Sequence, residues 1–181
     1  MAKQTKLVLP GDRNPKDSLA QILRVNHAGE YGARRIYEGQ LRILKGTRHE
    51  AKIREMWEQE AAHLSYFEKA IPEHRVRPTA LLPLWHVAGY ALGAATAMMG
   101  SRVAMACTVA VEEVIDQHYA EQEEQDLDPK LKQKIAEFRA DENHHRDIGL
   151  EEEAELAPGY DILTGVIKVG SRAAIWLSKR I

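Results

Sequence analysis

The stretch EAAH at residues 60–63 decides how this sequence folds and what it can bind. Glutamate and histidine three residues apart lie on one face of a helix, so both side chains can reach a single metal ion. The same pattern returns as ENHH at residues 142–145, which is 82 residues later. A lone glutamate precedes each copy by 30 residues, Glu30 in the first and Glu112 in the second. This repetition turns a common pair of residues into a strong indication of a metal site.

The composition is that of a folded chain with one core. The sequence has 181 residues, of which 44% are hydrophobic and 29% charged, and this length suits one domain better than two. The net charge of −2 and the lack of a basic stripe argue against a nucleic acid partner. The single cysteine, Cys107, excludes an internal disulfide and a thiolate metal cluster, and it favours a reducing compartment.

The chain is expected to form one domain after a short N-terminal segment. Residues 1–16 are polar and lack the apolar run of a secretory signal, so we expect a flexible segment and a mature chain that starts near Met1. Residues 17–181 are expected to form a single domain that contains both copies of the repeat.

Apolar residues recur at helical spacing in five segments, and no segment alternates as a strand does. The fold is therefore predicted to be all-α. Helix caps, prolines and glycines place the boundaries of the expected helices. Four bundle helices are expected at about residues 15–46, 47–72, 112–125 and 129–158, and an additional amphipathic helix at residues 160–179.

Residues 79–111 form the least polar region, in which Arg102 is the only charged residue. A transmembrane helix must be considered at this length. Several glycines, a proline and His86 interrupt the region, and a helix at the membrane interface or a buried crossover explains it better. We expect a long apolar crossover that continues without a break into the helix of Glu112.

Four glutamates on the apolar stripes of these helices need positive partners, because an unpaired charge buried in a core is costly. Helices that present one Glu, alternating with helices that present Glu-x-x-His, form the ligand set of di-iron and di-manganese carboxylate bundles. Oxygen-rich ligation with one imidazole per ion suits iron or manganese better than zinc. The spacing therefore predicts two metal ions held by six ligands: Glu30, Glu60, His63, Glu112, Glu142 and His145.

The same arrangement predicts a role for each ligand and for some neighbours. Glu60 and Glu142 are expected to bridge the two ions. Asp141 and Asp116 are candidates for accepting a hydrogen bond from the histidines' outer ring nitrogens, although plain surface carboxylates explain them equally well. Two tyrosines follow the lone glutamates by seven residues and could orient ligands or substrate, with ordinary buried tyrosines as the simpler interpretation: Tyr37 and Tyr119.

Five runs of this sequence closely resemble the demethoxyubiquinone hydroxylase family of ubiquinone biosynthesis. They are RVNHAGEYGA at 24–33, RVRPT at 75–79, AMACTVAVEE at 104–113, DIGL at 147–150 and AELAP at 154–158. The similarity extends over nearly the whole chain from about residue 18.

This resemblance implies a ferritin-like di-iron monooxygenase that hydroxylates demethoxyubiquinol with O2. The family's six ligands correspond to the six residues that spacing selects, and its cofactor is a pair of iron ions. Its substrate is a polyprenyl benzoquinol, which implies peripheral contact with a membrane surface. That surface would be the cytoplasmic face of a bacterial inner membrane, or the matrix face of the mitochondrial inner membrane for a processed eukaryotic chain. A ubiquinone-biosynthesis complex and a homo-oligomer are further partners to consider.

The resemblance also draws attention to four residues as candidates for the substrate entrance, although the two glycines among them could serve close helix packing instead: Arg24, Asn26, Gly29 and Gly32. Other functions remain open from the residues alone. A different di-iron hydroxylase acting on tRNA should carry a basic surface, and a ferroxidase or iron-storage protein needs no lipid-facing segment. A metal-free structural bundle predicts that Glu60→Ala leaves the core unchanged or more stable.

Overall fold

The computed structural model describes the backbone of residues 15–181 and the side chains of residues 18–181. The flexible segment expected at residues 1–16 lies almost entirely outside this range. Within it the chain forms six α-helices, one 3-10 turn and no strand, which confirms the all-α prediction. The elements are α1 (Pro15–Leu44), α2 (Glu50–Glu73), α3 (Leu82–Met98), α4 (Ser101–Glu123), α5 (Pro129–Glu151), η1 (Ala154–Leu156) and α6 (Tyr160–Ser178).

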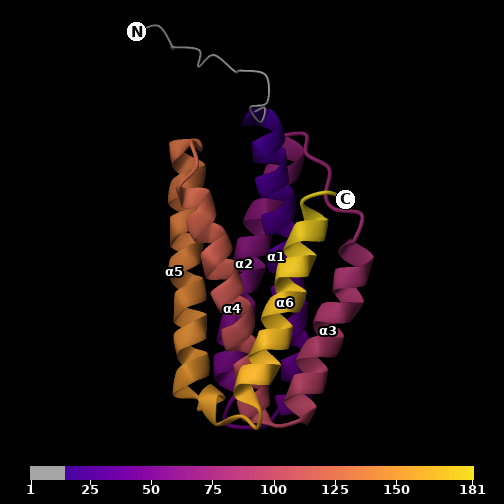
Figure 1. The fold of residues 1–181 in the computed structure, drawn as a ribbon, viewed down its shortest axis with the longest axis vertical. Helices are drawn as coiled ribbons and strands as arrows, with labels where there is room; N and C mark the ends of the chain where they lie inside the picture. Colours follow the sequence, from indigo (N-terminus) through magenta and orange to yellow (C-terminus); the bar gives the residue numbers. More distant parts are fainter. Residues whose placement is uncertain (1–14) are drawn as a thin grey trace, which may run out of the picture.

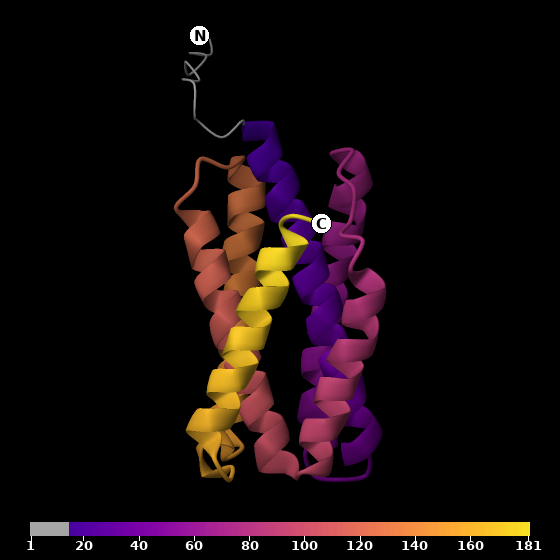
Figure 2. The same ribbon diagram turned by 45° about the vertical axis from the view of Figure 1, so that its right-hand side comes forward.

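Four long helices form the bundle, and two further helices cover one side of it. Successive helices run in opposite directions, with α1 packed against α2 and α4 against α5 (Figure 1). The helix α3 lies along α1, and α6 lies along α4 and also contacts α1. Figure 2 shows α6 crossing obliquely in front of the bundle with α3 beside α1. Both repeat halves therefore supply one helical hairpin, α1–α2 and α4–α5.

The expected crossover is a helix of its own rather than the beginning of α4. The chain turns between α3 and α4 at Gly100, whose φ of 122° is in the left-handed region that glycine adopts without steric cost. The prediction of an unbroken helix is therefore wrong. No helix in the described part of the chain is both long and apolar enough to span a membrane.

The helix α5 also ends earlier than expected. It stops at Glu151 rather than Pro158, because Glu153 adopts a left-handed φ of 65° and the chain then forms the 3-10 turn. Ala154, in that turn, is completely buried among apolar side chains such as Ile53 and Met105. The short turn therefore closes one end of the bundle before α6 begins.

Glycines allow α1 and α3 to approach until their backbones touch. A Cβ atom added at Gly93 would lie 1.9 Å from the carbonyl oxygen of Ile36, and one at Gly39 would lie 2.3 Å from that of Tyr90. Real side chains do not tolerate such distances to backbone atoms. Gly89 and Gly93 of the apolar region therefore allow the close contact between these two helices.

The core of the described chain contains three apolar clusters: a small one between α1, α4 and α6, and two larger ones at opposite ends of the bundle with polar side chains between them. One of the larger clusters contains Leu44, Ile53, Met56, Val103, Met105 and Ile148, and the other contains Leu23, Phe67, Ile71, Leu131, Ile135 and Phe138. Burial of these side chains excludes water from both ends of the layer that separates them.

We expect Gly93→Ala to destabilise the fold. The added methyl group forces α3 away from α1, and overpacking of this kind costs about 1–3 kcal/mol. Urea denaturation of the metal-free protein measures the change. The control is Gly165→Ala in α6, where an added Cβ meets nothing within 4 Å, and alanine should stabilise the helix by up to about 1 kcal/mol. Equal effects of the two substitutions would contradict the close helix contact.

Candidate metal centre

The six residues selected by the repeat meet in the layer between the two larger apolar clusters. The helices α1 and α4 each contribute one glutamate, and α2 and α5 each contribute a glutamate and a histidine. Each of the six residues is at most 3% exposed. We call this set the acid–imidazole cluster: Glu30, Glu60, His63, Glu112, Glu142 and His145.

The cluster divides into two groups of four that could each hold one ion. In each group the donor atoms lie within 4.8 Å of one another. One group adds Glu30 and His63 to a shared pair of carboxylates, and the other adds Glu112 and His145 to the same pair. The shared pair is Glu60 and Glu142, the two residues that the sequence predicts as bridging ligands. Two adjacent ions with common carboxylates fit this geometry.

The unpaired polar atoms of the cluster fit a metal pair. Eight buried donor or acceptor atoms of these residues lack a hydrogen-bond partner, including both oxygens of Glu60, both oxygens of Glu142 and Nδ1 of each histidine. Buried polar atoms in native proteins are almost always satisfied, so such a concentration requires an explanation. Two divalent ions would satisfy these atoms and neutralise the four carboxylates, and oxygen-rich ligands of this kind suit iron or manganese.

The electrostatics of the metal-free cluster point the same way. Burial raises the pKa of Glu60 well above its usual value, and the charges of Glu142 and Glu30 raise it further. Burial alone would also raise the pKa of Glu142, but the adjacent His145 and His63 lower it to about 2. Burial would lower the pKa of His63, whereas the neighbouring Glu142 and Glu30 raise it to about 12. Without metal, protonated histidines supply the positive charge that the carboxylates need.

Two buried tyrosines hold the lone glutamates of α1 and α4. The Tyr37 hydroxyl donates to Glu112, and the Tyr119 hydroxyl donates to Glu30, so each tyrosine reaches the glutamate of the other half. Burial raises the pKa of both phenols, and the charges of nearby carboxylates add to this effect. Both phenols therefore remain protonated donors at neutral pH, and each leaves one oxygen of its glutamate facing the cluster.

Two side chains orient the histidines from outside the cluster. Nε2 of His63 lies 3.0 Å from Oδ2 of Asp141, and Nε2 of His145 lies 2.6 Å from Oε1 of Gln59. Both partners are acceptors, so each Nε2 carries the proton and each Nδ1 is available to a metal. The structure places Asp116 elsewhere, accepting hydrogen bonds from Arg139 at 2.7 Å and from an asparagine side chain at 2.8 Å.

Gln59 was not selected from the sequence, although a signal for it exists. It precedes Asp141 by 82 residues, so it is the counterpart of Asp141 in the first repeat half. Its neutral side chain gives no charge signal, whereas Asp141 stands out as an acidic partner for a histidine.

The polar candidates for a substrate entrance instead hold the fold together. The Arg24 guanidinium donates to the carbonyl oxygens of Arg77 at 2.9 Å and Lys179 at 3.4 Å, and so joins α1 to the segment before α3 and to the end of α6. The buried amide of Asn26 exchanges two hydrogen bonds with Gln122 of α4. These contacts describe structural roles for both residues.

The glycine candidates line an apolar cavity of about 420 Å³ between α1, α3, α4 and α6. A Cβ added at Gly29 or Gly32 would meet no atom within 4 Å, so their own lack of a side chain leaves space rather than allowing a close contact. The cavity wall includes residues adjacent in sequence to the two lone glutamates. Its wall on α4 is formed by Val111, Val114 and Ile115, and its wall on α1 by Val25, Ala28, Gly29, Gly32, Ala33 and Ile36.

Three of the wall positions on α1 also follow the repeat. Gly29, Gly32 and Ala33 of α1 correspond, 82 residues later, to Val111, Val114 and Ile115 of α4. At these three pairs of positions the α1 residue is small and its α4 counterpart is larger. The cavity occupies the volume that the small residues leave free, and its wall includes Gly29 and Val111, the sequence neighbours of Glu30 and Glu112.

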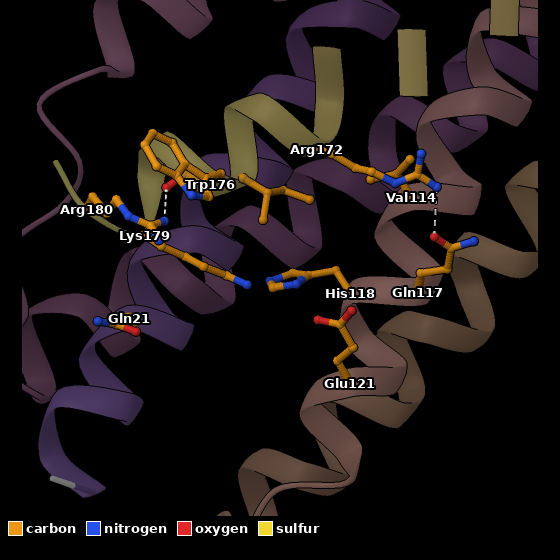
Figure 3. A pocket seen from close by; sticks show the side chains of 10 residues that line it. Gln21, Val114, Gln117, His118, Glu121, Arg172, Trp176, Lys179 and Arg180 are labelled. Carbon is orange, nitrogen blue, oxygen red and sulfur yellow. Dashed lines mark hydrogen bonds between the residues drawn. The ribbon is translucent and has the colours of Figure 1, made fainter. Parts of the chain in front are cut away.

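A second pocket of about 430 Å³ is lined by residues of α4, the end of α6 and Gln21 of α1 (Figure 3). Its cationic side chains are Arg172 of α6 and, just after that helix, Lys179 and Arg180, and Lys179 extends toward the ring of His118. The side chain of His118 lies 2.7 Å from that of Gln122, which links it to Asn26. Burial and the charge of Lys179 lower the pKa of His118 to about 3.

Comparisons with known proteins identify the family. Residues 17–178 match the family described as Ubiquinone biosynthesis protein COQ7. The chain belongs to this family. It is 48% identical over 176 residues to the 3-demethoxyubiquinol 3-hydroxylase of Rhodospirillum rubrum, covering 96% of this chain and 83% of the relative. It is also 48% identical over 176 residues to the human NADPH-dependent 3-demethoxyubiquinone 3-hydroxylase, mitochondrial, covering 94% of this chain and 81% of the relative.

A more distant member gives the same result. The 5-demethoxyubiquinone hydroxylase, mitochondrial, of Saccharomyces cerevisiae is 36% identical over 182 residues, covering 90% of this chain and 78% of the relative. The part of the chain that matches the COQ7 family contains all six residues of the acid–imidazole cluster and the cavity beside it.

We expect His118 to make the metal-free protein less stable in acid. Its pKa is about 3 in the fold and 6.5 as an unperturbed side chain, so the unfolded chain binds the additional proton between these values. This contribution to stability is complete above pH 6.5 and decreases by about 1.4 kcal/mol per pH unit below it.

The variant His118→Gln retains an acceptor for Gln122 and does not titrate. Urea denaturation of both metal-free proteins at several pH values between 7.5 and 5 isolates the histidine, because other titrating groups are common to both. Below pH 6.5 the free energy of unfolding of the unmodified protein should fall relative to that of the variant. A constant difference would contradict a neutral buried His118.

Proposed function

We propose that this chain is a di-iron monooxygenase that hydroxylates demethoxyubiquinol with O2 in ubiquinone biosynthesis. The observation that carries the proposal is an apolar cavity whose wall includes the sequence neighbours of Glu30 and Glu112, two members of the buried acid–imidazole cluster. The related proteins are hydroxylases of demethoxyubiquinol or demethoxyubiquinone by name, which supports the same substrate.

In this proposal Glu60 and Glu142, which both groups of donors share, would serve both irons, and the pairs Glu30/His63 and Glu112/His145 would each complete the ligands of one. The bound iron pair supplies the activation of O2, which carboxylate and imidazole side chains do not perform. The protein holds the ligands ready: the tyrosine hydroxyls fix the lone glutamates, and Asp141 and Gln59 keep the protons of the histidines on their outer nitrogens.

The cavity positions the quinol and excludes water. The substrate ring would lie near Glu30 and Glu112, because the cavity wall includes the adjacent residues Gly29 and Val111. Its walls are almost entirely apolar, so a dehydrated ring and the first part of a prenyl tail find a suitable environment. Trp85 of α3 donates to Ser178 of α6 at 3.0 Å and joins the two helices that cover the cavity.

The surface around the cavity is suited to a membrane that supplies the substrate. Exposed apolar side chains are concentrated on α3 and α6, the two helices over the cavity, and include Leu84, Val87, Ile162, Val166, Val169 and Trp176. Basic residues of α6 lie among them, as expected for a helix on an anionic lipid surface. We propose that this face lies on the inner membrane, in bacteria or in mitochondria, as a peripheral contact.

The alternative functions explain fewer of these features. A ferroxidase or iron-storage protein needs the metal ligands but has no use for an apolar cavity beside them. A metal-free bundle gives no reason for the eight unsatisfied atoms of the cluster.

The activity itself is the first test. The iron-loaded protein should contain two irons per chain and convert demethoxyubiquinol to its hydroxylated product with O2, as measured by mass spectrometry. Gly29→Leu should retain both irons but lower product formation by about 100-fold, because the leucine occupies the position of the ring. Glu60→Gln should lose iron and activity together.

The matched control is Ala51→Leu, which adds an apolar side chain at an exposed position of α2. No product from the iron-loaded protein under reducing conditions would refute the function. Unchanged turnover by Gly29→Leu would refute the assigned cavity.

Membrane contact is tested by sedimentation with vesicles that contain an anionic phospholipid. The double variant Ile162→Glu/Val169→Glu should weaken binding by at least about tenfold, because two apolar side chains no longer enter the interface. Added salt should weaken binding of the unmodified protein through the basic residues of α6. The control Leu150→Glu lies on α5, which contacts neither α3 nor α6, and should bind normally. Equal binding of all three proteins would argue against this membrane face.

A further inference from the structure

The two repeat halves agree at every cluster position and differ at the residues that orient the histidines. The pairs Glu30/Glu112, Glu60/Glu142 and His63/His145 are identical, and so are the supporting tyrosines. The corresponding pair one residue before the bridging glutamates is Gln59 and Asp141. A site that is otherwise two-fold symmetric in chemistry is therefore asymmetric at this one pair.

Each of these residues acts on the histidine of the opposite half. Asp141 of α5 accepts from His63 of α2, and Gln59 of α2 accepts from His145 of α5. Both histidines are at most 3% exposed, and their Nδ1 atoms lack hydrogen-bond partners and face the shared carboxylates. The two histidines therefore differ in the charge of the acceptor behind them, although Nδ1 of each lies within 3.4 Å of carboxylate oxygens of the cluster.

A carboxylate behind a ligating histidine has a stronger effect than an amide. The hydrogen bond to an ionised acceptor is charge-assisted and increases electron density on the ring, which strengthens the bond from the opposite nitrogen to a metal. The side chain of Asp141 is 46% exposed, so solvent weakens the effect without removing a direct contact of 3.0 Å to a buried ring. The amide of Gln59 orients His145 but adds no negative charge.

We propose that Asp141 and Gln59 make the two metal positions unequal. The position that contains His63 binds a divalent ion more tightly and is filled first, and the position that contains His145 binds its ion more weakly. Asp141 and Gln59 are positioning residues, because they act through the histidines. This inference rests on the proposed dinuclear site, and it concerns the order in which that site is filled.

The test uses Fe²⁺ under anaerobic conditions with the full chain. One equivalent of ⁵⁷Fe²⁺ is added first and one equivalent of ⁵⁶Fe²⁺ second, and Mössbauer spectroscopy then reports only the irons added first. The unmodified protein should give one predominant doublet, because the first ion selects the His63 position. Titration calorimetry with Fe²⁺ should show two steps, of which His63→Gln removes the tighter and His145→Gln the weaker.

Two substitutions with conserved shape then test the cause. Asp141→Asn should weaken the tighter step by about 10–100-fold and produce two doublets of similar intensity. Gln59→Glu should strengthen the weaker step instead, and the double variant should give the doublet of the opposite position. Either single variant is informative alone if the other folds poorly, and circular dichroism establishes folding.

The outcomes separate this inference from the proposed function. Two equal doublets in the unmodified protein, or no response to either substitution, would overturn the inequality while hydroxylation could still proceed. A protein that binds no Fe²⁺ would overturn both. A selective first ion whose preference follows residues 59 and 141 would support the inference.

Discussion

The layer of four buried carboxylates between two apolar clusters is the constraint on which the remaining structure depends. Four negative charges in a core would repel one another and lose their hydration, so the fold requires cations at that level. The two histidines supply part of this positive charge, and eight polar atoms of the cluster still lack a hydrogen bond. The apolar clusters above and below exclude water that would otherwise compensate. Affinity for metal is therefore a consequence of how the bundle is packed.

The second requirement is space for a large apolar molecule next to that layer. Small residues meet it in two different ways. Gly93 and Gly39 bring α3 onto α1, whereas Gly29 and Gly32 leave a hollow beside the cluster. The same residue type therefore produces both a tight contact and a cavity along one helix pair. Only the register of the two helices distinguishes these roles, and this explains why neighbouring glycines of α1 have opposite effects.

The sequence predicted the helices and the members of the cluster well, because both depend on spacing along one helix. The periodicity of Glu60 and His63 is local, and the repeat supplied the second copy. What could not be predicted depended on contacts between helices. The turn at Gly100 required knowing that α3 packs on α1, and the partner of Asp116 required the position of Arg139 on α5. Gln59 was overlooked because a neutral side chain gives no charge signal, although the repeat marked its position.

The 82-residue repeat has a consequence for how such a site can evolve. Two identical helical hairpins paired around an axis must carry the same residue at equivalent positions, so any substitution appears on both sides at once. Joining the hairpins through α3 removes that restriction. One wall can then be glycine while its counterpart is valine, and one histidine can face an acid while the other faces an amide. A covalent connection between two like halves thus permits an asymmetric site. One side can bind substrate, and each ion can have a different environment.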